Sequence, residues 1–393
     1  MIRSIVLFIT TASLLAGADQ PTERVENLKL TLTSVAMQDL LKLGRNANYA
    51  TAAPEAGAVA YRLRTKGGDV VLIDGNDDGV FDEQHDWMTL DDEKMLVPYS
   101  PAVFFPQGLL RLGALDKASK VLTCEFVVHQ GLNANVYAAM TFLNRVRVRN
   151  GSAMMTLDLA MCRACDQHAD YVATNHNTGM GLHAEQSGNP RYSPEGAAAA
   201  AGSSIYPMKP DLRAAMDGWI RTSWHAWPLI DPSTRSCGVT NKTGLSMFYR
   251  SGSHVFRMKD SSFTFPGADA TGVPLSFNSG EIPAPVPGKD TGSLGMPIMW
   301  RSADPRQRDC TVSLSMLVKG SPVAVAGYAS SPARPANPAW PHNSGLHLFV
   351  PAGPLKPATG YVVTIKMGDA VISESRFTTG STPDFLGSPG SRR

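Results

Sequence analysis

The sequence predicts an α+β chain of several domains, with strand-rich segments at both ends and a helical segment between them. The chain has 393 residues, and 43% of them are hydrophobic against 18% charged, so it can bury the cores of two or three domains. Short alternating or apolar runs between turns indicate strands, whereas apolar residues at helical spacing indicate helices. The 35 glycines and 28 prolines also predict many turns and a large β component.

The charge and the cysteines exclude some classes of protein. Lys and Arg number 36 and Asp and Glu 34, for a formal net charge of +2. A nucleic-acid-binding protein usually carries a basic face, so we expect no nucleic-acid partner. Five cysteines are too few for a disulfide scaffold, and their odd number leaves at least one unpaired.

Residues 1–18 predict a cleaved signal peptide. The basic start Met1-Ile2-Arg3 precedes an apolar run from Ile5 to Leu15, and small residues follow. This run is shorter than the roughly 20 residues that cross a bilayer, and no other segment is long and apolar enough to do so. We therefore expect a protein exported from a bacterial-type cell, secreted or held at the exterior of the cell envelope, and not membrane-spanning.

Residues 19–128 are expected to form a β-rich N-terminal domain. The segment Val59–Arg64 alternates between apolar and polar residues, which is typical of a strand with one buried face. The segment Asp69–Asp74 is an apolar run closed by acidic turn residues, which predicts a second strand. An amphipathic stretch from Val35 to Leu43 predicts one short helix in this domain.

An acidic turn in this domain has the spacing of a calcium-binding loop. Oxygen ligands at the first, third and fifth positions precede Gly79 at the sixth, as in such loops. The twelfth position holds His85 where a bidentate Glu is usual, and the preceding run predicts a strand rather than a helix. Calcium binding and an ordinary acidic β-turn both stay open, since Asp, Asn and Gly also favour turns. The candidate calcium ligands are Asp74, Asn76, Asp78, Asp82 and Asp86.

Residues 129–260 change to a helical pattern. Apolar residues recur at helical spacing from Val136, from Leu157 and from Leu212. Ser193-Pro194 supplies an N-cap and a first helical residue for an alanine-rich helix. This domain is therefore predicted to be mainly helical, unlike the segments on either side of it.

A series of short motifs in this helical segment shares its order and spacing with one known family. The motifs are Leu143-Asn144-x-x-Arg147, His168-Ala169-Asp170-Tyr171, His183, Gly202-Ser203-Ser204-Ile205, Trp219-x-x-x-Ser223-Trp224-His225 and Cys237-Gly238-Val239. In these residues the segment resembles the CAP superfamily of bacterial type, named for cysteine-rich secretory proteins, antigen and pathogenesis-related proteins, with its SCP-like domain.

This resemblance implies an α-β-α sandwich and a secreted binding or signalling module. The family shares a cleft lined by His and Glu that can hold a divalent cation. Carried over position by position, the resemblance assigns His183 and His225 to this cleft, whereas Ser203 stands where the family usually has a glutamate. Glu185 and Glu195 lie nearby in the sequence and are the candidates to replace that carboxylate.

The C-terminal part is predicted to be β-rich. Residues 261–305 are rich in Pro and Gly, which indicates a linker with edge segments. Residues 306–380 contain short strand patterns separated by turns, typical of an immunoglobulin-like β-sandwich. Residues 381–393 are polar, and we expect a disordered tail there.

These parts together predict a secreted bacterial protein that binds an unidentified extracellular ligand in a cleft containing His183 and His225. Whether it is an enzyme stays open, with binding favoured, and no residue is assigned as catalytic. The alternative is a metal-dependent hydrolase in which these histidines and a nearby Glu hold zinc or another divalent cation and activate a water. A structural cell-surface spacer is the third candidate. The sequence has no G-x-S-x-G elbow, P-loop, H-E-x-x-H or dinucleotide motif.

Overall fold

The computed structural model describes residues 23–381 and Phe385, with gaps at 41, 46–48, 66, 91–92, 208–210, 251–261, 279, 303 and 339–344. The predicted signal peptide (1–18) and all of the predicted tail (381–393) except Ser381 and Phe385 lie outside the described residues. Within the described ranges, no helix has the length and apolar character needed to cross a membrane.

Two sheets form the N-terminal part. One has the order β1-β10-β9-β8 and the other the order β2-β4-β5-β6-β7-β3. Apolar side chains such as Leu72 and Leu110 fill the space between them, as the alternating patterns predict. The elements are β1 (Glu23–Thr31), β2 (Thr33–Val35), α1 (Met37–Leu40), β3 (Gly44–Arg45), β4 (Val59–Thr65), β5 (Gly68–Asp74), β6 (Trp87–Leu90), β7 (Met95–Pro98), β8 (Ala102–Phe105), β9 (Gly108–Asp116) and β10 (Val121–His129).

The middle part places helices on both faces of a sheet with the order β11-β13-β14-β12. Neighbouring residues of β14 point to opposite faces: Met247 packs with α3 and Phe248 with α2 and α5. The expected α-β-α arrangement is therefore present. The elements are α2 (Ala134–Arg149), β11 (Thr156–Leu157), α3 (Leu159–Asn175), η1 (Gly179–His183), α4 (Pro194–Ala201), β12 (Ser203–Tyr206), α5 (Leu212–Ile220), α6 (Ala226–Ile230), β13 (Ser236–Thr240), η2 (Lys242–Gly244) and β14 (Ser246–Tyr249).

Polar residues that precede these helices fix where they begin. The side chain of Asn133 accepts a hydrogen bond from the backbone N–H of Val136 at the start of α2. Ser193 does the same for Gly196 at the start of α4, and Pro194 occupies the first turn, as predicted. Each cap satisfies a backbone donor that has no partner inside its helix.

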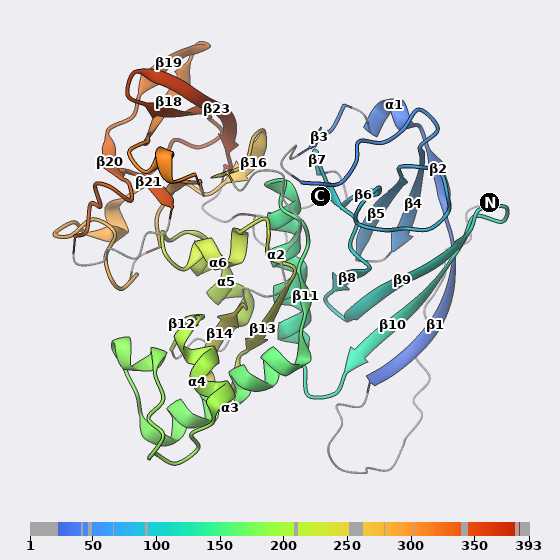
Figure 1. Ribbon diagram of the computed structural model, residues 1–393, viewed down its shortest axis with the longest axis horizontal. Coiled ribbons are helices and arrows are strands. Elements are labelled where there is room, and N and C mark those ends of the chain that lie inside the picture. The colour runs from blue at the N-terminus through green and yellow to red at the C-terminus, as the bar shows by residue number, and fades with distance from the viewer. Residues whose placement is uncertain are drawn as a thin grey trace.

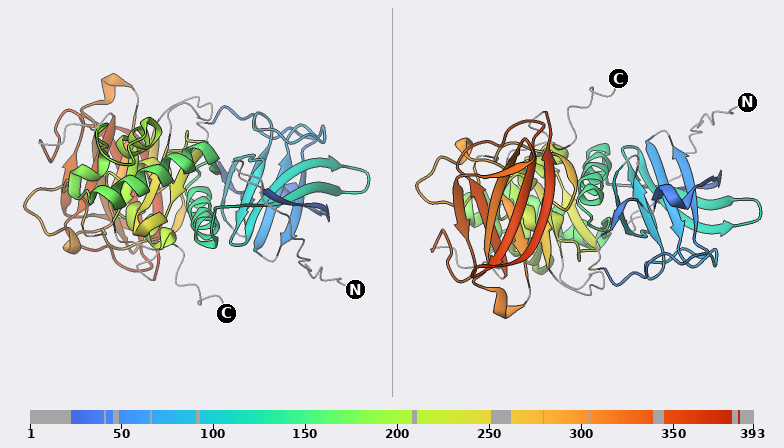
Figure 2. Two further views of the ribbon diagram at one scale, coloured as in Figure 1. Left: turned by 90° about the horizontal axis from the view of Figure 1, so that it is seen from below. Right: turned by 90° about the horizontal axis from the view of Figure 1, so that it is seen from above.

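The C-terminal part consists of two further sheets, with the orders β15-β17-β21-β20 and β16-β23-β22-β18-β19. Met299 and Leu348 of the first share one core with Val312 and Val363 of the second, so the sheets pack face to face (Figure 2). The elements are β15 (Phe263–Phe265), β16 (Ala270–Val273), η3 (Thr291–Ser293), β17 (Ile298–Arg301), η4 (Pro305–Gln307), β18 (Thr311–Val318), β19 (Ser321–Ala324), β20 (Gly327–Ser330), β21 (Leu346–Pro351), β22 (Gly360–Met367) and β23 (Ala370–Thr379).

The segment 261–305, which we expected to be a linker with edge segments, contributes strands to both of these sheets. β17 pairs with β21 in the first sheet, and β16 pairs in parallel with β23 in the second. These strands are only three or four residues long and lie among prolines and glycines, so no alternating pattern identifies them. The immunoglobulin-like assignment of 306–380 stays a prediction.

Helix α2 lies where the three parts meet (Figure 1). Its residue Met140 belongs to one continuous core with Phe104 of β8, Met216 of α5 and Met299 of β17. Tyr137 of α2 also accepts a hydrogen bond at 2.7 Å from the backbone N–H of His129, at the end of β10. The N-terminal domain therefore docks on the middle domain through α2.

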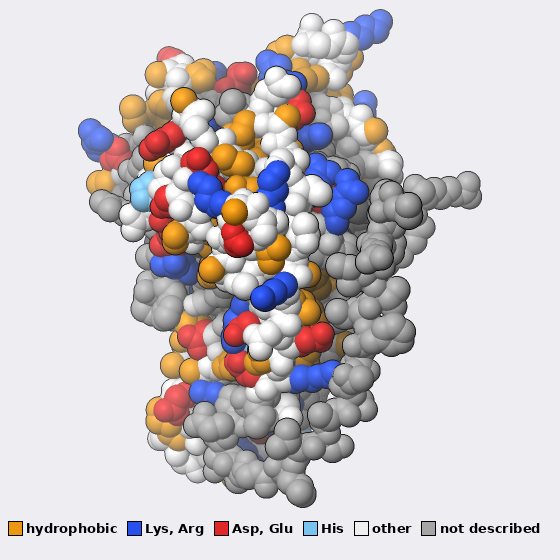
Figure 3. All heavy atoms as spheres, turned by 90° about the vertical axis from the view of Figure 1, so that its right-hand side faces the viewer, with side chains coloured by type: hydrophobic (Ala, Val, Ile, Leu, Met, Phe, Trp, Pro, Cys, Tyr) orange, Lys and Arg blue, Asp and Glu red, His pale blue; other side chains and the backbone are white. Residues whose placement is uncertain are grey.

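Acidic and basic side chains are interspersed on the face seen in Figure 3, over the portion where described residues lie. This mixing agrees with the near-zero net charge of +2.

Arg147, near the end of α2, is fully buried and binds four backbone carbonyl oxygens. Its guanidinium donates to Ala153 at 2.7 Å, to Leu229 at 2.6 Å, to Asp231 at 3.0 Å and to Thr234 at 3.1 Å. Burial lowers the pKa of Arg147 to about 10, so the group keeps its charge at neutral pH. It thereby joins α2 to the segments that precede β11 and that follow α6.

We predict that Arg147→Met lowers the free energy of unfolding by about 3–5 kcal/mol, because it leaves buried carbonyl groups without donors. Urea denaturation of the full chain measures the difference. Arg163→Met, on an exposed position of α3, is the matched control and should change the free energy by no more than about 0.5 kcal/mol. Equal midpoints for the two variants would contradict the role given to Arg147.

Candidate functional site

His183, at the end of η1, is a partly buried histidine held by one backbone acceptor. Its Nδ1 lies 3.2 Å from the carbonyl oxygen of Ala200 on α4, so Nδ1 carries the proton and donates it. Burial lowers the pKa of His183, and repulsion from His225 and His168 lowers it further. The ring is therefore neutral at neutral pH, and Nε2 is left with its lone pair as an acceptor.

His225 is the N-cap residue of α6, and a buried carboxylate fixes its ring. Nδ1 lies 3.2 Å from Oε1 of Glu281, and the side chain of His225 is 17% exposed. A proton on Nδ1 is donated to this carboxylate, so in the neutral ring Nε2 is again the acceptor. The two histidines predicted from the family resemblance each have Nδ1 bound, and the charge of His225 contributes to lowering the pKa of His183.

Glu281 is the residue of this candidate site that sequence reasoning missed. It lies in the predicted linker, yet its side chain is 0% exposed. Its carboxylate accepts hydrogen bonds from the backbone N–H groups of Ser223 at 2.9 Å and His225 at 3.2 Å, and also from that of Trp224. This negative charge sits at the positive end of α6, which favours its position.

Further hydrogen bonds hold the segment around Glu281 against the turn between α5 and α6. The indole Nε1 of Trp224 donates to the carbonyl of Pro283 at 2.9 Å, and the N–H of Asn278 donates to the carbonyl of Arg221 at 2.9 Å. The only sequence signal for this role is an isolated Glu in a stretch that has few other charges.

Glu185 and Glu195, the candidates to replace the missing family carboxylate, differ in their surroundings. Glu185 is buried and pairs with His168, with Oε1 2.9 Å from Nδ1 of that ring. The other ring nitrogen of His168 lies 2.8 Å from the carbonyl oxygen of Leu182, so both nitrogens face oxygen acceptors. Glu195 is exposed in the first turn of α4.

Strand β12 connects the surroundings of the two histidines. Ser203, which stands at the family's glutamate position, donates its hydroxyl proton to the carbonyl of Ala199 in α4. Ser204 donates to the carbonyl of His225 at 3.2 Å. These serines therefore fix backbone positions rather than supply a charge.

The residues present do not fit a catalytic metal site. Among the described residues, no group of three or more His, Cys, Asp or Glu side chains is arranged to hold a metal ion. Catalytic zinc sites use three protein ligands, whereas here His183 and His225 are two imidazoles and the buried carboxylates bind other partners.

The five cysteines are all free and buried. Burial raises the pKa of the Cys162 thiol to about 12, and it also raises the pKa of the Cys165 thiol. Thiols that stay protonated are poor nucleophiles and poor metal ligands, which agrees with a packing role.

The acidic turn after β5 uses its carboxylates as acceptors for backbone N–H groups. Asp74 accepts from Asp78 at 3.1 Å and from Gly79 at 2.9 Å. Asp86, which is fully buried, accepts from Gly75 at 2.8 Å and from Asp82 at 2.5 Å. Calcium binding by Asp74, Asn76, Asp78, Asp82 and Asp86 stays a prediction from the sequence.

The comparisons with known proteins agree with the resemblance stated from the motifs. Residues 140–244 match the model of the CAP domain, described as the cysteine-rich secretory protein family. This confirms a CAP-like domain in the middle of the chain. No curated protein matches the sequence.

Two bacterial structures are also similar to the chain. An extracellular protein containing an SCP domain from Bacillus anthracis str. Ames is 12% identical over 56% of this chain and 94% of its own, with a TM-score of 0.25. A cysteine-rich secretory protein from Staphylococcus aureus subsp. aureus Mu50 is 9% identical over 55% of this chain and 90% of its own, with a TM-score of 0.23.

We predict that Glu281→Gln lowers the free energy of unfolding by about 1–3 kcal/mol, because a neutral amide leaves buried N–H donors poorly satisfied. Thermal and urea unfolding measure the loss. Glu195→Gln is the control, since it removes the same charge from an exposed position. If the two variants are equally stable, Glu281 does not hold the turn that carries His225.

A second prediction concerns the pH dependence of stability. Burial raises the pKa of Asp86 to about 6 from an ordinary value of 3.8. Between these two values the folded chain holds a proton that the unfolded chain has lost, so the free energy of unfolding falls as pH rises from about 4 to about 6. We expect Asp86→Asn to flatten this decline, which urea denaturation at a series of pH values measures. Part of the decline should remain in this variant, because burial also raises the pKa of Asp74 and this group lowers the free energy of unfolding with rising pH in the same way.

The matched control for this measurement is Asp39→Asn, because the Asp39 side chain is 64% exposed. This variant should keep the wild-type profile. A profile that Asp86→Asn leaves unchanged would show that the Asp86 carboxyl is not the group that titrates in this range.

Proposed function

We propose that this chain is an extracellular binding module of the CAP class and that His183 and His225 contact its ligand. The observation that carries the proposal is the pairing of these histidines, each with Nδ1 bound to an oxygen and Nε2 left as an acceptor. Binding sites commonly fix orientation with a small number of such polar groups on a rigid framework.

The chemistry of the pair defines the class of ligand. Neutral imidazole nitrogens accept hydrogen bonds, and Glu185 and Glu281 are already engaged by His168 and by backbone N–H groups. A ligand that offers uncharged donors, such as the hydroxyl groups of an oligosaccharide, is complementary to two such acceptors. The metal-dependent hydrolase is less favoured, since the described residues lack a third ligand beside the two imidazoles.

Export to the cell exterior is part of the proposal. It is supported by the apolar run from Ile5 to Leu15 behind a basic start, and by the description of the matching family as secretory. The third candidate is a structural spacer, which would not need two histidines held in fixed orientations. The hydrogen bonds on both rings therefore favour binding over this alternative.

Binding to an array of extracellular oligosaccharides tests the proposal. The full mature chain should bind at least one of them, and His183→Gln combined with His225→Gln should weaken that binding about tenfold or more. The control is His176→Asn, because His176 is exposed with φ 56° and Asn tolerates this backbone region. Binding that the double variant retains, or an array with no bound member, would contradict the proposal.

The same variants test the hydrolase alternative through zinc titration by calorimetry. Two imidazoles without a third protein ligand should give weak zinc binding at most. Stoichiometric nanomolar binding that both single variants abolish would restore the metal site in place of the proposed function.

A further inference from the structure

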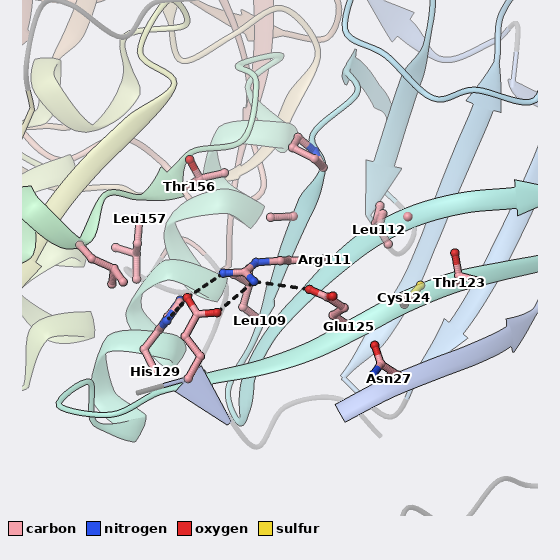
Figure 4. A pocket seen from close by; sticks show the side chains of 15 residues that line it. Asn27, Leu109, Arg111, Leu112, Thr123, Cys124, Glu125, His129, Thr156 and Leu157 are labelled. Atoms are coloured by element: carbon pink, nitrogen blue, oxygen red, sulfur yellow. Dashed lines mark hydrogen bonds and ion pairs between the residues drawn. The ribbon is translucent and has the colours of Figure 1, made fainter. Parts of the chain in front are cut away.

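A cavity of about 730 Å³ lies between the face of the β1-β10-β9 sheet and the segment that leads into α3 (Figure 4). Its volume falls within the range of about 300–1,000 Å³ that is usual for small-molecule sites. We call it the junction pocket, because Leu109 of the N-terminal sheet and Leu157 of the middle domain both line it. It is separate from the histidine pair.

The strand register gathers four titratable side chains on one face of this sheet. Arg111 of β9 is paired with Glu125 of β10, and Glu23 of β1 is paired with His129 of β10. Residues 125 and 129 are an even number of positions apart, so their side chains point to the same face. All four side chains line the junction pocket.

The charges of this group do not cancel. Arg111 is bound by both oxygens of Glu23, at 2.9 and 3.1 Å, and more loosely by Glu125 at 3.4 Å. The hydrogen bond from Arg111 holds the pKa of Glu23 below its usual value, so Glu23 is ionised. Burial lowers the pKa of His129, which leaves that ring neutral. Two carboxylates therefore face one guanidinium, and the pocket carries a net negative charge.

One acceptor in the pocket remains available for a ligand. The side chain of Glu125 is 45% exposed, and a single long contact to Arg111 leaves most of its lone pairs unused. Nδ1 of the buried His129 lies 3.2 Å from Oε1 of Glu23, so it faces an acceptor and does not serve as one itself. Glu125 is therefore the acceptor in this pocket that a ligand donor can use.

Apolar side chains line the pocket beside these charged groups. Leu109 projects from the sheet, and Leu157 approaches from the middle domain, with Thr156 beside it. A ligand with an alkyl chain could bury that chain against these leucines, while a polar group at its end contacts the carboxylates.

We propose that the junction pocket binds a monocation with an apolar stem, an alkylammonium or alkylguanidinium group, with Glu125 as its counter-ion. The cation can belong to a free amine or to a Lys or Arg side chain of a peptide, since both offer the same head and stem. This site is independent of the ligand contacts proposed for His183 and His225.

Titration of the full mature chain with n-butylamine, followed by saturation-transfer NMR, tests the proposal. We expect saturable binding that weakens when NaCl is raised, because the attraction is between charges. The isosteric alcohol n-butanol should bind about tenfold more weakly or not at all. N-acetyl-lysine methylamide probes the peptide source, and binding of either cation supports the proposed chemistry.

Glu125→Gln should weaken binding of the cation about fivefold or more, whereas Glu55→Gln, an exposed acid of the same domain, should not change it. The exposed position of Glu125 means that the variant keeps its fold, which the thermal unfolding curve verifies. Equal binding of n-butanol and n-butylamine, unchanged binding by Glu125→Gln, or no saturable binding of either cation would overturn the proposal.

Discussion

The buried guanidinium of Arg147 is the interaction on which the arrangement of the three parts depends. A buried charge is costly unless several groups compensate for it, and here four carbonyl oxygens accept hydrogen bonds from the guanidinium. Three of these carbonyls belong to residues 229–234, so one side chain of α2 fixes the path of the chain after α6. The same turn is bound by Tyr49, whose hydroxyl donates to Pro232 at 2.8 Å, and by Arg301 through Asp231. All three parts of the molecule meet at this turn.

This arrangement also decides where the histidine pair lies. His225 immediately precedes α6, and the end of α6 is held by Arg147, so the helix cannot shift without disturbing these bonds. Glu281 binds the other end of the same short helix from the C-terminal part. Five helical residues are too few to be stable alone, and α6 depends on these two contacts and on burial of its apolar side chains.

Capping residues and apolar patterns in the sequence predict individual helices and strands here. They do not predict which segments pair when these lie far apart in the sequence. Ser193-Pro194 begins α4 as predicted, and the strand pattern Asp69–Asp74 lies within β5. The order of the motifs predicts a shared cleft for His183 and His225, although about 40 residues separate them in the sequence. By contrast, Glu281 becomes a partner of His225 only because β16 and β17 join the C-terminal sheets, and such short strands have no readable periodicity. The same limit applies to the junction pocket, whose charges come together through strand register.

The positions of the Glu185 and Glu281 carboxylates explain why His183 and His225 are suited to accepting hydrogen bonds rather than to hydrolysis. A hydrolytic base must be free to take a proton, yet Glu185 is bound by His168 and by the N–H of Ser193 at 3.0 Å. Glu281 is likewise surrounded by N–H donors of the α5–α6 turn and is fully buried. Both carboxylates therefore organise the backbone around the histidines, and the imidazole Nε2 atoms are the groups left to meet a ligand. The junction pocket differs in this respect, because its Glu125 carboxylate retains unused lone pairs. This carboxylate can therefore bind a ligand directly, and its negative charge favours a cation.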